Sequence, residues 1–354
     1  MGTARLITRT RAFLGLLVLG AALVFAAPLG AAKPTAYTVV PLISNQPTLA
    51  PMTDPDLQNA WGLTSGPTTP WWVSDNAVNK STLYNAAGVK QGLIVSVPGA
   101  PTGTVFNTTA GFNLPTGGRA LFLFDGEDGI VSAWNGAQGT TAIVPGDGDQ
   151  SATGAVYKGL AIATTPSGPE LFAADFHNNK IDVFDSNFKL LPNTGFSDPS
   201  MHKGFAPFDV QVIGNRVFVS YARQDADAHD DSPGQGRGFV DVYDLSGNLL
   251  GGINGHGQLN SPWGLAMAPA SFGTFAGDLL VGNFGDGRIN TFEVSHGQFR
   301  FSGQLIGGHG PIEIDGLWAL QFAQGGNNGT AGTLYFTAGP NGEADGLFGR
   351  IQVG

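Results

Sequence analysis

The chain has 354 residues and no cysteine, which excludes a disulfide framework, a thiolate nucleophile and a cysteine-ligated metal. Its 54 glycines and 22 prolines, with only 12% charged residues, are typical of a protein built from strands and turns. The formal net charge of −10 makes nucleic acid and anionic membranes poor partners, because both require basic protein surface.

Residues 1–32 have the pattern of a secretory signal peptide. Three arginines precede an apolar run over residues 12–27, and small residues follow at Gly30 and Ala32. We expect cleavage before Lys33, because the run is short for a membrane span; an uncleaved anchor is the alternative. Removal of the three arginines leaves 14 basic and 27 acidic residues, a formal charge of −13, on a mature protein that we expect to be secreted or periplasmic.

A repeated pattern of short strands fills the rest of the chain. Tyr37–Ile43 is predicted to be a strand without a hairpin partner nearby, and six units then follow, of which Leu171–Leu191 shows the strand alternation most clearly. Each unit opens with a short strand whose third residue recurs at intervals of roughly 40 to 55 residues. These six residues are Trp61, Thr102, Lys158, Phe208, Trp263 and Trp318.

The number of strands in each unit predicts how the chain closes. The first five units each contain four predicted strands, whereas the sixth contains three. If Tyr37–Ile43 supplies the outer strand of the last sheet, six four-stranded sheets close into a ring without open edges. The sequence therefore predicts an all-β, six-bladed β-propeller over residues 33–354. A β-solenoid or a pair of sandwiches is the alternative, and it leaves the first strand unexplained.

Several phrases of the sequence resemble known propeller repeats. LFAADFHNNKIDVFD and DLLVGNFGDGRINTFE resemble NHL-type repeats. NAWGL, FVDVYDLSGNLL, SPWGLAMAP and IDGLWAL resemble a family of uncharacterised exported bacterial β-propellers, some of which end in a PEP-CTERM sorting tail. This chain ends at Gly354 without the apolar helix of such a tail, so anchoring by that route is not expected. The resemblance implies a propeller fold and export, and it supplies no activity.

The loop over residues 222–237 concentrates potential metal ligands in the fourth unit. So many acidic groups repel one another unless a cation or an arginine neutralises them. An EF-hand requires glycine at the sixth position, where this loop has Asp230. We predict that a divalent cation, calcium or zinc, binds here with His177 from the third unit; a solvated loop paired internally with Arg223 or Arg237 is the alternative. The predicted ligands of the loop are Asp225, Asp227, His229, Asp230 and Asp231.

Histidines of adjacent units are expected to converge on one face of the ring. Such a set can bind a transition ion or act as acid and base near neutral pH, although loop histidines are also common as ordinary polar surface. If the protein is an enzyme, its candidate catalytic residues are His202, His256, Glu313 and Asp315.

The large residues that open the units have two interpretations. Trp61, Trp263, Trp318 and Phe208 either line a channel as a stacking surface for a sugar or pack as core between the blades. Lys158 takes the same position in the third unit, where its amine is available to pair with a nearby carboxylate.

No complete catalytic motif is present. The chain lacks a P-loop, a Rossmann glycine pattern, HExxH and GxSxG, so no organic cofactor is expected. We therefore favour a monomeric, exported binding or scaffold protein that holds a cation on its acidic face. Its ligand would be a small molecule, a saccharide or a protein, and neither nucleic acid nor, in the mature form, a membrane. The alternative is a metal-dependent hydrolase, lactonase or lyase that acts at the channel mouth.

Overall fold

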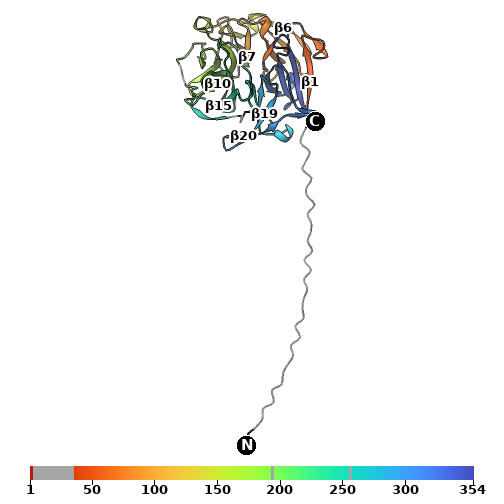
Figure 1. Ribbon diagram of the computed structural model, residues 1–354. Coiled ribbons are helices and arrows are strands. Elements are labelled where there is room, and N and C mark those ends of the chain that lie inside the picture. Colours follow the sequence, from red (N-terminus) through yellow and green to blue (C-terminus); the bar gives the residue numbers. More distant parts are fainter. Residues whose placement is uncertain (3–35, 193–194, 254, 256) are drawn as a thin grey trace. The chain divides into compact units, whose positions relative to one another are not determined.

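Six sheets follow one another around a ring in the computed structural model, which describes residues 1–2, 36–192, 195–253, 255 and 257–354 (Figure 1). The predicted signal peptide, apart from residues 1–2, lies outside the described residues. Residues Thr35–Gly354 form one unit, and the described helical segments in it are short 3-10 turns. No helix in the described part of the chain has the length and apolar character needed to cross a membrane.

The blades are numbered in chain order, each from its inner strand outward. Blade 1 consists of β3 (Ala60–Thr64), β4 (Trp71–Asp75), β5 (Lys80–Tyr84) and β6 (Lys90–Ser96). Blade 2 consists of β7 (Pro101–Phe106), β8 (Phe122–Gly126) and β9 (Ile130–Trp134). Blade 3 consists of β10 (Tyr157–Thr165), β11 (Gly168–Asp175) and β12 (Lys180–Asp185). Blade 4 consists of β13 (Phe205–Ile213), β14 (Arg216–Arg223), β15 (Gly238–Asp244) and β16 (Leu249–Ile253). Blade 5 consists of β17 (Pro262–Met267), β18 (Leu279–Asn283), β19 (Ile289–Ser295) and β20 (Gln298–Gln304). Blade 6 consists of β23 (Leu317–Phe322), β24 (Leu334–Ala338), β25 (Leu347–Val353) and β1 (Tyr37–Ser44), with β2 (Met52–Thr53) beside β1, and a small hairpin of β21 (Ile306–Gly307) and β22 (Gly310–Pro311) precedes it.

The first strand closes the ring, as the strand count predicts. β1 pairs antiparallel with β25 from Tyr37 opposite Val353 to Ser44 opposite Leu347, so the two ends of the unit share one sheet (Figure 1). The Tyr37 hydroxyl also donates a hydrogen bond to the carbonyl of Phe272 in blade 5, over 3.0 Å. The predicted six-bladed β-propeller is therefore confirmed.

Two blades have a weaker fourth strand than the sequence predicts. In blades 2 and 3 the outermost position is held by single bridges, Ala133 with Ile143 and Phe184 with Leu190. Phe188 adopts a φ of +61°, which lies outside extended geometry. This backbone conformation interrupts the strand that the apolar pattern alone predicts over residues 188–191.

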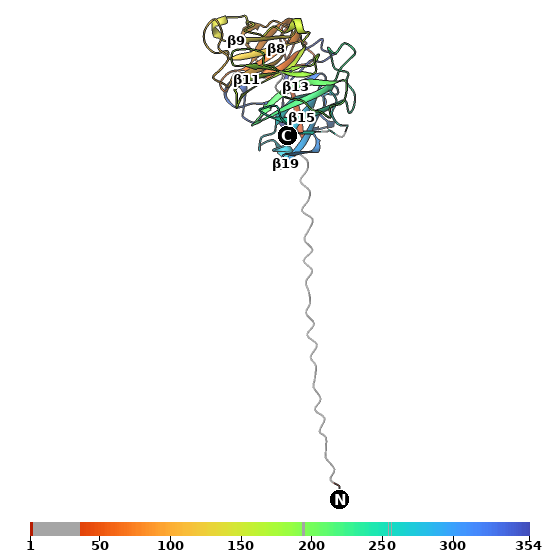
Figure 2. The ribbon, with the colours of Figure 1, turned by 90° about the vertical axis from the view of Figure 1, so that its left-hand side faces the viewer.

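The inner strands pack around the axis in chain order. β3 contacts β7, β7 contacts β10, and the series continues through β13, β17 and β23 back to β3. Figure 2 accordingly shows β8 and β9 of blade 2 on the far side of the ring from β19 of blade 5. Glycine after the opening large residue allows this approach: a Cβ added at Gly264 would lie 2.5 Å from the Trp318 carbonyl oxygen of the next blade.

Substitution at this contact should loosen the ring. We expect Gly264→Ala to lower the free energy of unfolding by about 1–3 kcal/mol, because the new methyl group overpacks two inner strands. Gly308→Ala is the matched control, since nothing lies within 4 Å of its added Cβ. Denaturant unfolding of both variants checks the expectation, and equal stability of the two would contradict it.

Candidate functional site

Aromatic rings from four blades meet at the axis and close it. Trp61 stacks on Trp318 with 3.5 Å between ring centroids, Trp263 meets Trp61 edge-on at 6.1 Å, and Phe208 lies 5.8 Å from Trp318. All four side chains are buried. They therefore form a plug on the axis, in agreement with the interpretation as core, and they leave no open aromatic channel wall for a sugar.

Lys158, at the same inner-strand position on β10, lies on top of this plug. Its side chain is only 1% exposed, and its ammonium lies 5.2 Å from the ring centroid of Trp61. The ammonium forms ion pairs with the carboxylate of Glu127 from blade 2 and with Asp230 Oδ1 from blade 4, the latter over 3.0 Å. The expected pairing of this lysine with a carboxylate is confirmed, and it joins three blades.

Opposing effects set the charges in this group. Burial disfavours the charged form of Lys158, but attraction to Glu127 and Asp230 outweighs it and raises the pKa of the lysine. Partial burial works against ionisation of Asp230, yet Lys158 and His229 together lower the pKa of this carboxyl. The shifts of Lys158 and Asp230 both favour the charged form, so this ammonium and this carboxylate are ionised at neutral pH.

An amide chain extends the group across the mouth. Asn76 Nδ2 donates to Glu127 Oε2 over 2.8 Å, and Asn59 Nδ2 donates to Glu343 Oε2 over 2.7 Å and to Asn76 Oδ1 over 3.1 Å. Trp318 Nε1 in turn donates to Asn59 Oδ1 over 3.2 Å, which ties the chain to the plug. Burial raises the pKa of Glu343 in spite of the Asn59 hydrogen bond, and its φ of +67° is a strained conformation for glutamate.

The long loop of blade 4 folds toward blade 3. Asp225 Oδ1 accepts hydrogen bonds from the backbone amides of Asp227 and His229, and these contacts shape the turn. Gln224 Nε2 donates to the carbonyl of Phe176 over 2.6 Å, and His177 Nδ1 lies 3.3 Å from the carbonyl oxygen of Ala228. The loop thereby carries Asp230 to Lys158.

The structure brings two of the predicted metal ligands together with an acid that the prediction had omitted. The ligand atoms of Glu127, His229 and Asp230 all lie within 4.8 Å of one another, and His229 Nδ1 is 3.0 Å from Asp230 Oδ1. Glu127 directly follows β8, the second strand of its blade, and the loops after second strands lie on the same face as the loop of blade 4. This position in the sequence could have identified Glu127 as a potential ligand.

The other predicted ligands lie around this group. Asp225 caps the loop backbone, the Asp227 side chain is exposed, and His177 contacts the loop through Ala228. Asp231 is partly buried, and burial raises its pKa to about 6. Arg237 donates to Ser232 and Pro233 rather than to a carboxylate. The cation that pairs with Asp230 of this loop is therefore Lys158 of another blade.

The candidate catalytic residues do not join the group. Glu313 forms an ion pair with Arg288 over 2.8 Å, and Asp315 Oδ2 accepts from the Asn341 amide over 2.8 Å. His202 lines a separate pocket beside blade 4, and His256 lies outside the described residues. A catalytic role for these four residues stays a prediction.

Removal of the lysine charge should destabilise the mouth. We expect Lys158→Met to lower the free energy of unfolding by about 3 kcal/mol at pH 7, because it leaves two carboxylates without their cation. This loss of stability should become smaller as the pH falls below about 4, because the two carboxylates are then protonated in either protein. Toward high pH it should persist until the lysine of the parent protein deprotonates.

Unfolding of this variant by denaturant at several pH values measures both effects. Lys189→Met, at an exposed lysine of blade 3, is the matched control and should change stability by less than about 0.5 kcal/mol. A Lys158→Met protein as stable as the control at pH 7 would show that the ion group contributes nothing.

Comparisons with known proteins identify relatives of the whole chain. No model of a known protein family matches it. It is 33% identical to "Uncharacterized protein L690" of Acanthamoeba polyphaga mimivirus over 92% of this chain and 89% of that protein. It is 32% identical to "Uncharacterized protein R648" of the same virus over 90% of this chain and 80% of that protein.

Solved structures show the same fold at low sequence identity. A glucose dehydrogenase is 11% identical over 90% of this chain and 100% of that chain, with a TM-score of 0.55. A streptogramin B lyase is 11% identical over 90% of this chain and 98% of that chain, with a TM-score of 0.50. The relatives named above are viral, so the bacterial origin and the sorting tail implied by the resemblance gain no support. The chain belongs to the protein family that includes the uncharacterised mimivirus proteins L690 and R648.

Proposed function

We propose that this protein is an exported binding protein that holds a divalent cation at its channel mouth. The convergence of Glu127, His229 and Asp230, with ligand atoms within 4.8 Å of one another, is the observation that carries the proposal. The three residues come from blades 2 and 4, so packing of these blades around blade 3 assembles the site. The signal-peptide pattern of residues 1–32 supports export, and the acidic composition supports a partner that is not nucleic acid.

The donor set favours a transition-type ion. One imidazole and two carboxylates suit zinc or manganese better than calcium, which prefers a shell made only of oxygen ligands. Three protein ligands leave coordination positions open, so an oxygen of a bound molecule can complete the shell. Lys158 forms ion pairs with the same two carboxylates, and an incoming ion therefore competes with it for Asp230 Oδ1.

The surroundings indicate where a ligand would bind. The aromatic plug closes the axis below Lys158, so a ligand is confined to the mouth above it. The partly buried carboxyl of Glu343, held by Asn59, provides a polar group there that suits a small polar molecule or a saccharide.

A metal-dependent hydrolase or lyase is the second candidate function. It is favoured by the pairing of His229 with Asp230, because a carboxylate beside an imidazole orients that imidazole as a metal ligand. The bound ion would then act as Lewis acid toward a carbonyl. Metal-dependent cleavage of a lactone that is lost in His229→Ala would favour this candidate over simple binding.

Calorimetric titration with Zn²⁺ and with Mn²⁺ tests the proposed site. The protein should bind one ion, and Glu127→Gln and His229→Ala should each weaken binding by about tenfold or more, because each removes one ligand. Lys158→Met should bind the ion more tightly than the parent, since it removes the competing ammonium.

Asp128→Asn is the matched control. Asp128 is exposed and adjacent to Glu127, so its loss changes the net charge equally without removing a ligand of the group. If no ion binds stoichiometrically and a chelator leaves the melting temperature unchanged, the proposed metal site is wrong. Equal weakening by Asp128→Asn and Glu127→Gln would show that only general electrostatic attraction is measured.

A further inference from the structure

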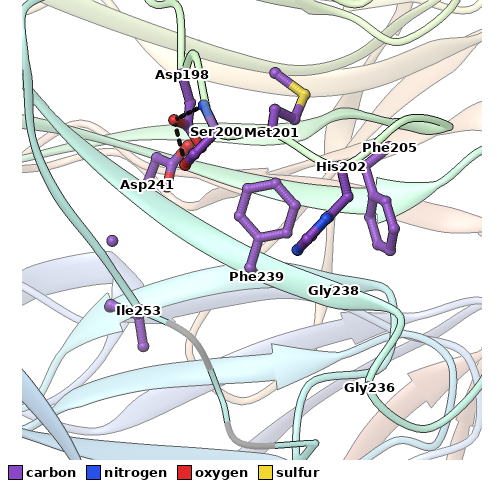
Figure 3. Close-up of a pocket in the computed structure, with 11 residues that line it drawn as sticks. Asp198, Ser200, Met201, His202, Phe205, Gly236, Gly238, Phe239, Asp241 and Ile253 are labelled. Atoms are coloured by element: carbon purple, nitrogen blue, oxygen red, sulfur yellow. Dashed lines mark hydrogen bonds between the residues drawn. The ribbon is translucent and has the colours of Figure 1, made fainter.

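A second cavity lies beside blade 4, apart from the channel mouth. Its volume is about 310 Å³, and it is bounded by the segment before β13, by β15 and by the end of β16 (Figure 3). A volume of this order accommodates a small organic molecule rather than only a water or an ion. His202, one of the predicted catalytic residues, lies on its wall between Phe205 and Phe239 in Figure 3.

One end of this pocket is acidic. Asp198 and Asp241 lie there together with Ser200, and the lining that the structure describes contains no lysine or arginine (Figure 3). The Asp198 carboxylate is fixed by hydrogen bonds from the Ser200 amide and hydroxyl, over 2.8 and 2.7 Å. Two carboxyl groups therefore share one end of the pocket, with no lysine or arginine among the described lining residues to pair with them.

Asp241 directs an unused acceptor into this space. The residue is only 4% exposed, and its Oδ2 accepts from the Tyr243 hydroxyl over 3.3 Å. Its Oδ1 accepts no hydrogen bond from the described residues, and a Cβ at Gly252 would lie 2.8 Å from it, so glycine at that position keeps the oxygen uncovered. Burial, reinforced by Asp198, raises the pKa of Asp241 to about 7, as expected for a carboxyl that lacks a cationic partner.

Beside His202, much of the remaining wall is aromatic or aliphatic. Phe239 stacks on Tyr221 with 4.5 Å between centroids, and Phe205 lies 5.6 Å from Phe239. Met201 and Ile253 complete the apolar lining. Aromatic faces attract cations as well as apolar groups, so this wall complements the acidic end.

We propose that this pocket binds a small organic ammonium, with the charged group at Asp198 and Asp241 and its apolar part against Phe205 and Phe239. A metal ion fits the pocket less well. Within the described residues, the ligand atoms of three such side chains converge to within 4.8 Å only at the channel mouth, and Asp198, Asp241 and His202 do not form such a group. The ammonium site is independent of the cation proposed at the mouth.

Calorimetry with 2-phenylethylamine tests the site, with 2-phenylethanol as its neutral isostere. 2-Phenylethylamine should bind at least about tenfold more tightly than the alcohol, because its ammonium donates a charge-assisted hydrogen bond to the buried Asp241 carboxyl. Asp241→Asn should remove this preference, whereas Phe239→Leu should weaken both probes. Asp128→Asn, on blade 2, is the charge-matched control and should change neither affinity.

Three results would overturn the proposal: no measurable binding of 2-phenylethylamine, equal affinity for the amine and the alcohol, or Asp241-dependent binding of Mn²⁺ without binding of the amine. If Asp241→Asn melts too low for titration, Asp198→Asn provides the second test, because Asp198 is only partly buried. Retention of the full amine preference in Asp198→Asn would then count against the site.

Discussion

The ammonium of Lys158 constrains the centre of this propeller more than any other single group. A buried charge is costly unless it is paired, and Lys158 occupies an inner-strand position that three other blades fill with tryptophan. Its partners come from blade 2 and blade 4, so neither loop can move away without exposing a charge to the aromatic plug. The ion group joins the neighbouring blades 2, 3 and 4, and β1 closes the ring at blade 6 by pairing with β25. Closure at the outer edge and charge pairing at the axis therefore hold different parts of the ring together.

Blade 4 contributes to both of the sites described. The loop after β14 delivers Asp230 and His229 to the mouth, and Gly236 and Gly238 at its other end border the pocket that contains Asp241. The backbone of this loop is held by Asp225 and by the contact of Gln224 with blade 3. The loop is long because it extends from the channel mouth to the pocket that contains Asp241, and not because it forms a single metal-binding turn.

Local patterns in the sequence were sufficient to predict the ring. The strand alternation and the recurring opening residues depend on contacts within a blade, and the missing sixth-unit strand indicated the role of Tyr37–Ile43. The site could be predicted only in part, because its contacts depend on how the blades are arranged. Glu127 is 31 residues from Lys158 and Asp230 is 72, and nothing in the local sequence pairs them. The pocket at Asp241 could not be predicted from the sequence, because an aspartate within a strand has the pattern of an ordinary solvent-facing residue.

Because the Lys158 ammonium already pairs with the acids at the mouth, folding of the mouth does not require a bound metal ion. In a loop whose acids are neutralised only by a metal, removal of the ion would unfold the loop, and the ion would be structural. Here Lys158 already compensates Glu127 and Asp230, and backbone hydrogen bonds to Asp225 shape the turn without any ion. A divalent cation at the proposed site would therefore exchange with a lysine ion pair rather than complete the fold. Its affinity would be moderate and its coordination open, which are properties of a site that serves ligand binding.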